Sequence, residues 1–388
     1  MASRDRGRGA VSSRFRASTI LGLLSSADEQ FIGAVVCFAT QGSGSGDERR
    51  IVELLAPLAP TLLTFDRGAK GRTLIRLLRE LRRRRPDLVV MEGTGLTGGM
   101  ALLLAHRWFG TPYVVSSGDA VAPFVAAGHP WLRLGAHVYE RLLYACSAGV
   151  IGWSPYIVGR AISMGAPRAA TAANWSAGTS AEDARATIRR RLGIPEDAVV
   201  FGLIGSLNLA RRLEWCYGVE LVLALRATDR VDLRVLIVGD GSGRSRLEEL
   251  AGADLGRRVL LPGRCAPEEV LDFLAAMDVG SLPQTLDPVG ALRYTTKLSE
   301  YVAAGLPVVT GQLPLAYDLD DGWIWRLPGD VPWSPEYIGA LTALMSSVSS
   351  NELAIRRARV PIGLAIFDRS LQQRRIVNLV RDILAAGV

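Results

Sequence analysis

The sequence predicts an α/β protein of two domains, each a parallel sheet covered by helices on both faces. Short apolar runs of strand length alternate with longer helical patterns along most of the 388 residues, and this alternation is typical of doubly wound sheets. A polar, charged stretch over residues 178–195 divides the alternation into two series. With 49% hydrophobic and 7% aromatic residues, the chain is long and apolar enough for two globular domains.

The first series opens without the usual strand. A domain of this kind normally begins with a strand, a glycine turn and a helix, but here a polar start leads directly into a helical pattern over residues 10–26. We therefore expect that the first strand is absent or lies upstream, and that the sheet has a gap or a substitute strand. Further strands are predicted at 31–39, 60–65, 88–91, 113–116 and 150–153, with helices at 51–58, 71–85, 98–108 and 131–145.

The second series contains the stretch that predicts a ligand site. A loop there ends a strand at 279–282 and leads into a helix at 296–304, and open α/β sheets bind ligands at that edge. Thr295 and Thr296 offer N-cap hydroxyls, and free N–H groups at such a helix start attract phosphate. The other strands are expected at 199–205, 233–238, 259–263 and 307–310, with helices at 270–277, 335–348, 351–359 and 371–386.

Lys297 and Glu300 distinguish the helix at 296–304. Lysine occurs only at Lys70 and Lys297 among 45 cationic residues, so a compact ammonium group here favours a specific role. Glu300 lies three residues later on the same helix face and could accept hydrogen bonds from two vicinal hydroxyls. An ordinary ion pair on a helix surface is the alternative.

The segment KLSEYVAAGLPVV, residues 297–309, resembles the donor-site motif of the retaining GT-B glycosyltransferases of family 4. In that family a glutamate ahead of a small-residue helix holds the ribose of a nucleotide sugar, and Glu300 matches it. The first glutamate of the family's E-x7-E pattern is missing, because Leu292 stands there. Residues 287–290 resemble the family's EPFG turn, displaced by a few positions, which makes Gly290 a donor-site candidate.

The glycine turn after residues 199–205 suits a diphosphate. Glycine lets the backbone approach a phosphate, and guanidinium groups supply paired donors. In the family a basic residue follows that glycine and a lysine comes six residues later, whereas here Ser206 replaces the first and Arg212 falls on the second. Gly205, Arg212 and, as an alternate, Arg211 are therefore donor-site candidates. Solvated arginines at a helix start are the alternative.

Two more positions follow from the resemblance. The segment GDGSGRSRLEEL, residues 239–250, is similar to the family's V-G-D-G-x-x-R-x-x-L-E sequence and adds Gly241 to the donor site. It is a weak dinucleotide fingerprint, because the spacing is G-x-G-x-G and no acidic residue follows at the expected distance. The strand at 259–263 resembles the one that ends beside the nucleobase, which leaves Arg264 near the base.

Asp119 is the catalytic candidate of the first series. It follows the strand at 113–116 on the ligand-binding edge of the sheet, where the family often carries a histidine or aspartate near the transferred sugar. A helix cap is the alternative role. His129 and Arg133 follow in a loop and helix that could shape the acceptor pocket, although a turn role for His129, which precedes Pro130, is equally open.

The charge balance favours anionic partners. The formal net charge is +7 and the isoelectric point about 9.5. The densest basic segment, residues 72–85, has one leucine face and arginines elsewhere, so it either packs on a core or lies against anionic lipid. No aromatic residues are interleaved with its charges, which argues against a nucleic-acid partner.

Other classes of site and compartment are not indicated. Three histidines and four scattered cysteines show no metal-ligand spacing, and no apolar run reaches the length of a membrane span. We expect a cytoplasmic protein, with an anionic membrane surface at the inner face as one candidate partner.

The resemblance implies a GT-B fold, in which two Rossmann-like domains face each other across a cleft and a C-terminal helix crosses back to the first domain. The acceptor-side domain is expected at residues 1–195, the donor-side domain at 196–365 and the crossing helix at 366–388. It also implies that a sugar moves from a UDP- or GDP-type donor to a glycan, lipid-linked or small-molecule acceptor, with retention of configuration and without metal or cofactor. A nucleotide-binding protein without transferase activity and a nucleotide-sugar epimerase remain alternatives.

Overall fold

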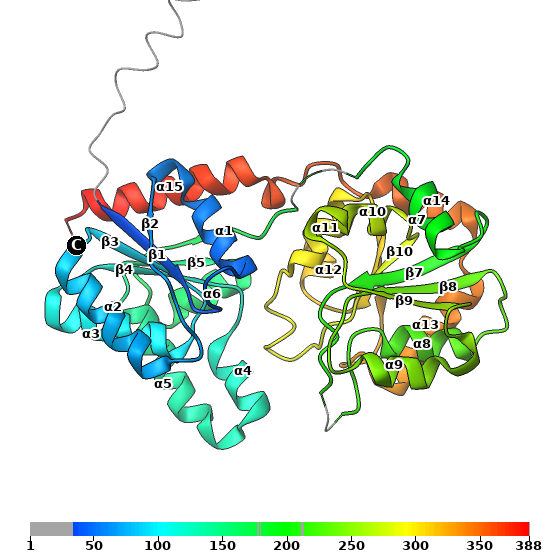
Figure 1. Ribbon diagram of the computed structural model, residues 1–388, viewed down its shortest axis with the longest axis horizontal. Helices are drawn as coiled ribbons and strands as arrows, with labels where there is room; N and C mark the ends of the chain where they lie inside the picture. Colours follow the sequence, from blue (N-terminus) through cyan, green and yellow to red (C-terminus); the bar gives the residue numbers. More distant parts are fainter. Residues whose placement is uncertain (1–33, 177, 179, 211–212, 388) are drawn as a thin grey trace, which may run out of the picture.

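The computed structural model describes residues 34–176, 178, 180–210 and 213–387. Two parallel sheets of six strands each lie side by side, with helices on both faces of each (Figure 1). The predicted two-domain α/β architecture is therefore confirmed. The helix predicted at residues 10–26 and the donor candidates Arg211 and Arg212 lie outside the described residues.

The first sheet has the strand order β2-β1-β3-β4-β5-β6. Its apolar residues pack against α2, α3 and α5 on one face and against α1 and α15 on the other. The strands are β1 (Val35–Ala39), β2 (Thr61–Leu62), β3 (Leu88–Glu92), β4 (Tyr113–Ser117), β5 (Gly149–Gly152) and β6 (Ala169–Thr171). The helices are α1 (Gly46–Leu54), α2 (Lys70–Arg84), α3 (Leu96–Phe109), α4 (Val121–Gly128), α5 (Arg133–Ala145) and α6 (Pro155–Ser163).

The expectation of a gap or a substitute strand is not met within the described residues. Strand β1 pairs in parallel with β2 on one side and with β3 on the other, where Val35 to Ala39 stand opposite Leu88 to Glu92 without interruption. A glycine-rich turn joins β1 to α1, and the Ser45 hydroxyl caps that helix by accepting from the Glu48 N–H. A strand, a glycine turn and a helix are thus present, and β1 supplies the strand.

The second sheet has the order β12-β11-β10-β7-β8-β9, with α7, α10 and α11 on one face and α8, α9 and α13 on the other. Its strands are β7 (Val199–Ile204), β8 (Leu233–Val238), β9 (Val259–Gly263), β10 (Val279–Leu282), β11 (Val308–Gly311) and β12 (Ile324–Leu327). The helices are α7 (Ala184–Leu192), α8 (Val219–Arg226), α9 (Arg244–Ala251), α10 (Val270–Ala275), α11 (Thr296–Ala303), α12 (Leu315–Asp318), α13 (Pro335–Ser347) and α14 (Ser350–Arg359).

Helix α7 corrects the predicted domain boundary at residue 195. Ile188 belongs to the core of the second domain, and the Arg189 guanidinium donates to the Ala276 and Ala198 carbonyls and to Asp278. Helix α7 therefore packs on the second domain although it precedes the predicted boundary. The polar composition of this helix concealed its packing, because the buried Arg189 binds main-chain carbonyls there.

The C-terminal helix α15 (Arg369–Ala385) returns to the first domain, as predicted. Ile376, Val380 and Ile383 are buried in the core that contains β1 and α1. In Figure 1 this helix runs along the upper edge of the first domain after crossing from the second.

The basic helix α2 packs on a core, which decides between its two predicted roles. Leu77 and Leu81 are buried and its arginines line the outer side, so the leucine face is not available to lipid. In the part of the chain that is described, no helix combines the length and apolarity needed to cross a membrane. Over the same ranges, no three His, Cys, Asp or Glu side chains are grouped as metal ligands would be.

Candidate functional site

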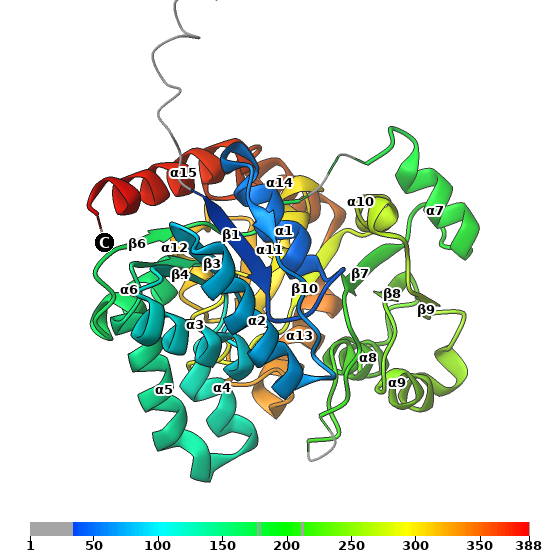
Figure 2. The ribbon, with the colours of Figure 1, turned by 60° about the vertical axis from the view of Figure 1, so that its left-hand side comes forward.

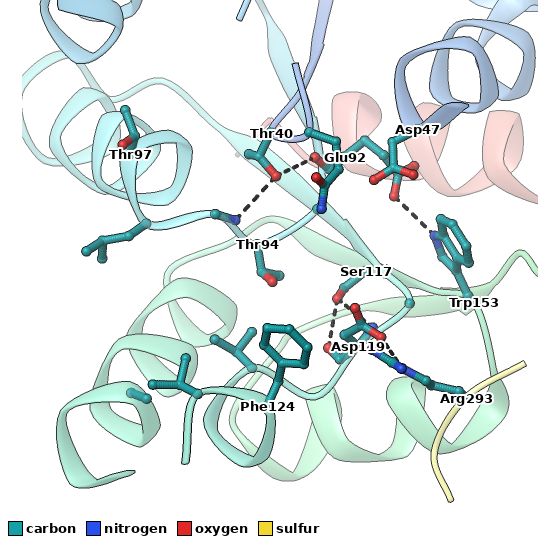
Figure 3. A pocket seen from close by; sticks show the side chains of 18 of the residues that line it. Thr40, Asp47, Glu92, Thr94, Thr97, Ser117, Asp119, Phe124, Trp153 and Arg293 are labelled. Carbon is teal, nitrogen blue, oxygen red and sulfur yellow. Dashed lines mark hydrogen bonds and ion pairs between the residues drawn. The ribbon is translucent and has the colours of Figure 1, made fainter. Parts of the chain in front are cut away.

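A cavity of about 880 Å³ opens where the carboxyl ends of the first sheet meet a loop of the second domain. Both lysines of the chain line it, Lys70 from the first domain and Lys297 from the second. Figure 3 shows its polar wall, which also includes Thr40, Asp47, Glu92, Thr94, Thr97, Ser117, Asp119, Trp153 and Arg293. The predicted position of a site between the domains agrees with this cavity.

Asp119 lies in the cavity and pairs with the Arg293 guanidinium across the domain boundary. The alternative that Asp119 caps a helix is wrong. The cap of α4 is instead the Glu140 carboxylate of α5, which accepts from the N–H groups of Val121 and Ala122 at 3.1 and 3.0 Å. Asp119 therefore stays at the cavity surface with its side chain 47% exposed.

A buried ion pair holds the Glu92 side chain in the wall of the cavity. The Arg50 guanidinium donates to the Glu92 carboxylate at 2.5 Å and lies 4.4 Å from the Trp153 ring centre. The Trp153 indole N–H donates to the other Glu92 oxygen at 3.1 Å (Figure 3). Because both ionic side chains are almost fully buried, each depends on the other for compensation of its charge.

Asp47, in the first turn of α1, adds a third carboxyl group to the first-domain side of the cavity, beside Glu92 and Asp119. Burial, and then the neighbouring Glu92 carboxylate, raise its pKa to about 6, against the opposing influence of Arg50. A carboxyl group that titrates near neutral pH can exchange a proton with a bound hydroxyl.

Lys297 brings the two predicted donor segments together. A methyl group at Gly205 would lie 2.8 Å from its Cε, and its Nζ lies 4.5 Å from the Tyr217 ring centre. The glycine turn after β7 therefore touches the start of α11. Burial lowers the pKa of the Lys297 ammonium group. The Glu300 carboxylate opposes this shift in the pKa, and the Arg293 guanidinium adds to it. A bound diphosphate would restore the missing negative partner.

Glu300 lies about one turn along α11 from Lys297, which acts on its carboxyl group only through charge. Burial raises the Glu300 pKa to about 7, and Lys297 partly opposes that shift. The pKa of the Cys265 thiol is raised by burial, then by Glu269, and to a smaller extent by Glu300. Cys265, the residue that follows Arg264, is therefore close enough to Glu300 to be affected by its charge. Both side chains are half-buried, so the predicted alternative of an ion pair on the helix surface does not describe them.

The first turn of α11 is open toward the cavity. Thr295 occupies the N-cap position, but its side chain makes no cap hydrogen bond, and its buried hydroxyl has no partner among the described residues. The Thr296 hydroxyl accepts from the Asn174 amide at 2.6 Å instead. Both threonines line the cavity, so the cationic end of the helix dipole is available to an anion.

The remaining donor candidates have structural roles at the same edge of the sheet. A methyl group at Gly241, where φ is +157°, would lie 2.5 Å from the Leu207 carbonyl, so glycine lets the turns after β7 and β8 meet. The Gly290 N–H donates to Asp287 in the turn that resembles EPFG. Arg264 is exposed immediately after β9.

His129 and Arg133 do not reach the cavity. The His129 N–H closes the end of α4 on the Val125 carbonyl, and its ring lies 5.0 Å from that of Trp131. Its predicted turn role is therefore confirmed, and the acceptor role predicted for both residues finds no support in the cavity lining.

Sequence reasoning missed Thr40, Glu92, Trp153 and Arg293 as cavity residues. Three of these follow or end a strand of the first sheet, at β1, β3 and β5. The rule that places ligands at the carboxyl ends of parallel strands would have found them if applied to every strand. Arg293 gave no such signal.

Two family models match the chain. The Glycosyl transferase 4-like domain matches residues 20–175 and the Glycosyl transferases group 1 domain matches residues 198–331. The chain belongs to the group 1 glycosyltransferases of family 4. A D-inositol 3-phosphate glycosyltransferase of Corynebacterium urealyticum is 34% identical over 140 residues, which are 34% of this chain and 31% of the relative. The chain thus spans less than a third of that curated relative's length in the match.

Two solved structures with folds similar to that of this chain confirm the predicted GT-B architecture. Sucrose-phosphate synthase from Thermosynechococcus elongatus has a TM-score of 0.70 at 16% identity, covering 91% of this chain and all of that one. Anabaena HepE, solved in complex with UDP, has a TM-score of 0.61 at 15% identity, covering 90% of this chain and 100% of that one. At these identities the likeness concerns the fold alone.

Proposed function

We propose that the protein transfers a hexosyl group from a UDP- or GDP-type sugar to a glycan, lipid-linked or small-molecule acceptor. The observation that carries the proposal is the contact between Gly205 and Lys297, because it joins the glycine turn to the start of α11. A diphosphate held there meets an ammonium group and free N–H groups, which stabilise the charge that develops on the leaving group. The UDP complex of HepE, which shares the fold, supports a donor of this class.

Different donor-side residues bind the ribose, the diphosphate and the base of the nucleotide sugar. Glu300 accepts hydrogen bonds from the ribose hydroxyls, and Lys297 with the α11 terminus binds the diphosphate. Arg212, with Arg211 as its alternate, adds a guanidinium group to the diphosphate, as the family resemblance implies. Gly205, Gly241 and Gly290 let the backbone approach, and Arg264 lies beside the base.

On the acceptor side, Asp119 acts near the transferred sugar. The resemblance supports retention of configuration, with the departing phosphate taking the proton of the acceptor hydroxyl, and a reaction that needs no metal or other cofactor. Arg67 and Lys70 at the cavity would suit an acceptor that carries phosphate. The name of the corynebacterial relative, which gives D-inositol 3-phosphate, supports that class.

Incubation with UDP- and GDP-sugars, with and without a mixture of sugar-phosphate and lipid-linked acceptors, tests the proposal. Acceptor-dependent release of the nucleotide diphosphate together with a glycosylated product is the expected result. Binding without turnover would instead favour a nucleotide-binding protein that has lost transferase activity. Conversion of the donor sugar to its epimer without an acceptor would favour the epimerase alternative.

Asp119→Asn separates the two sides of the site. It should lower kcat by about a hundredfold while the affinity for UDP stays unchanged, because the side chain faces the sugar and acceptor rather than the nucleotide. Isothermal titration with UDP and a nucleotide-release assay measure the two quantities. An unchanged kcat would remove Asp119 from the catalytic assignment.

A further inference from the structure

The helix pair α4–α5 exposes large apolar side chains that the proposed function does not use. Phe124, Trp131 and Leu134 are 57%, 76% and 75% exposed, and Leu132, Val138 and Leu142 are between 45% and 49% exposed. Figures 1 and 2 show this pair, with the turn Pro130–Leu132 at its tip, projecting from the lower end of the first domain. We propose that the exposed side of this pair docks on an anionic lipid bilayer.

The apolar residues form a continuous stripe. Leu134, Val138 and Leu142 are spaced four residues apart on α5, so they share one side of the helix over a length of about 12 Å. Trp131 extends the stripe beyond the helix start. The opposite side of α5 carries the buried residues Glu140, Leu143 and Tyr144. An exposed apolar stripe of this extent marks a docking surface.

The charges beside the stripe select the partner. Arg133 and Arg141 lie in a parallel row on α5 with the imidazole of His137 between them, and all three side chains are exposed. The one acidic residue between positions 120 and 145 is Glu140, whose carboxylate is buried and held by the Arg160 guanidinium at 2.7 and 2.8 Å. The surface around the stripe is therefore cationic without compensation from its own helices. Two copies of this face would repel each other, whereas an anionic headgroup layer complements it.

Helix α2 shows that basic charge alone does not make such a surface. It carries more arginines than α5, but its leucines are turned into the core of the first domain. Helix α5 instead combines arginines with a row of three apolar side chains that face solvent, and insertion at a membrane interface needs both.

The stripe adjoins the acceptor side of the cavity. Phe124, Leu132 and Ala136 of the pair also line the cavity, and so does Leu96, which is 64% exposed at the start of α3. Docking on a bilayer would bring the cavity to the headgroup layer, where a lipid-linked phosphate acceptor lies. Docking itself does not depend on the proposed function, whereas this delivery of the acceptor rests on it.

Flotation with vesicles tests the docking surface. Wild-type protein should float with vesicles of equal parts phosphatidylglycerol and phosphatidylcholine, and much less with phosphatidylcholine alone or at high salt. The variant Trp131→Gln/Leu134→Gln/Val138→Gln should lose at least about tenfold in partitioning, because each burial in the interface contributes through apolar area. The matched control Val231→Gln/Ile362→Gln, which changes residues 82% and 102% exposed on the second domain, should partition as wild type does.

The outcomes separate docking from the transferase function. Titration with UDP should give equal affinities for all three proteins, which shows that the variants are folded. Equal flotation of the stripe variant and wild type, or no flotation of wild type with anionic vesicles, would overturn the proposal. A dimer that only the stripe variant disrupts would overturn it in favour of a second copy. Failure of sugar transfer in proteins that still float would count against the proposed function alone.

Discussion

The proposed donor side of the site is carried by one helix and one glycine turn, whereas the proposed acceptor side is assembled from the ends of four strands. Lys297 and Glu300 lie within the first five residues of α11, and Lys297 meets Gly205 directly. The acceptor wall instead takes Thr40, Glu92 and other residues from separate segments of the first domain. A compact local motif fixes the recognition of one ligand class, while a wall of scattered residues can be changed piece by piece.

Each of the two sides nevertheless contains a carboxyl group whose pKa is raised by burial. Burial raises the pKa of Glu300 to about 7 and that of Asp47 to about 6. Each side of the cleft thus holds one acid whose charge changes close to neutral pH, one on the donor helix and one at the acceptor wall. Substitutions can show whether the sides work independently.

Arg50→Met should have the largest effect, and it should fall on the acceptor domain. Removing the guanidinium leaves the Glu92 carboxylate buried and unpaired, which costs about 3–5 kcal/mol in the free energy of unfolding. The double variant Arg50→Met/Glu92→Gln should recover most of the loss, because no buried charge remains. Urea unfolding followed by tryptophan fluorescence measures both, and an unchanged single variant would show that the pair is not needed.

Glu300→Ala should weaken UDP binding by about tenfold to a hundredfold, because it removes hydrogen bonds to a charged group worth about 1.5–3 kcal/mol. Glu249→Ala, at a side chain 71% exposed on the same domain, is the matched control and should bind UDP normally. Isothermal titration gives both affinities. Equal affinities for the two variants would refute the ribose assignment.

The affinity for UDP-glucose should rise by up to about tenfold between pH 6 and pH 8. The Glu300 pKa is raised to about 7, so the carboxyl group is mostly protonated at pH 6 and ionised at pH 8, and the ionised form accepts ribose hydroxyls. The diphosphate of UDP-glucose does not titrate in this range, so the slope reports the protein. Glu300→Gln should flatten the profile, and a profile that is equally steep in this variant would assign the slope to another group.

Arg293→Gln should have the smallest effect. It breaks the cross-domain ion pair with Asp119, whose side chain is 47% exposed, so the free energy of unfolding should fall by less than about 1 kcal/mol. The difference from wild type should shrink further at high salt. Thermal unfolding at low and high salt measures it. A larger, salt-independent loss would show that the pair fixes the two domains together.

The donor helix could be predicted almost to the residue. The pattern from Thr296 to Gly305 carries its own start, apolar stripe and glycine end, and the structure places α11 at Thr296–Ala303. The acceptor wall could not, because Glu92 resembles an ordinary strand end until Arg50 and Trp153 are seen to bind it. The boundary at residue 195 failed for a similar reason, since the arginines of α7 bind carbonyls far along the chain.

The choice between α2 and α5 as the lipid-facing helix also depended on tertiary packing. The sequence marked the basic segment of α2 as the candidate for lipid, but packing buried its leucines. Helix α5, with fewer arginines, was left with Leu134, Val138 and Leu142 toward solvent.

The sequence by itself determined the alternation of strands and helices, the two-domain division and the position of the helix that we propose binds the donor. These depend on periodicity and on turn residues, which act over a few positions. The tertiary structure alone decided which strand ends share a cavity, which helix hides its apolar face and how Arg293 meets Asp119. Those outcomes depend on contacts between segments far apart in the chain, and the burial that gives them their energy exists only once the domains are packed.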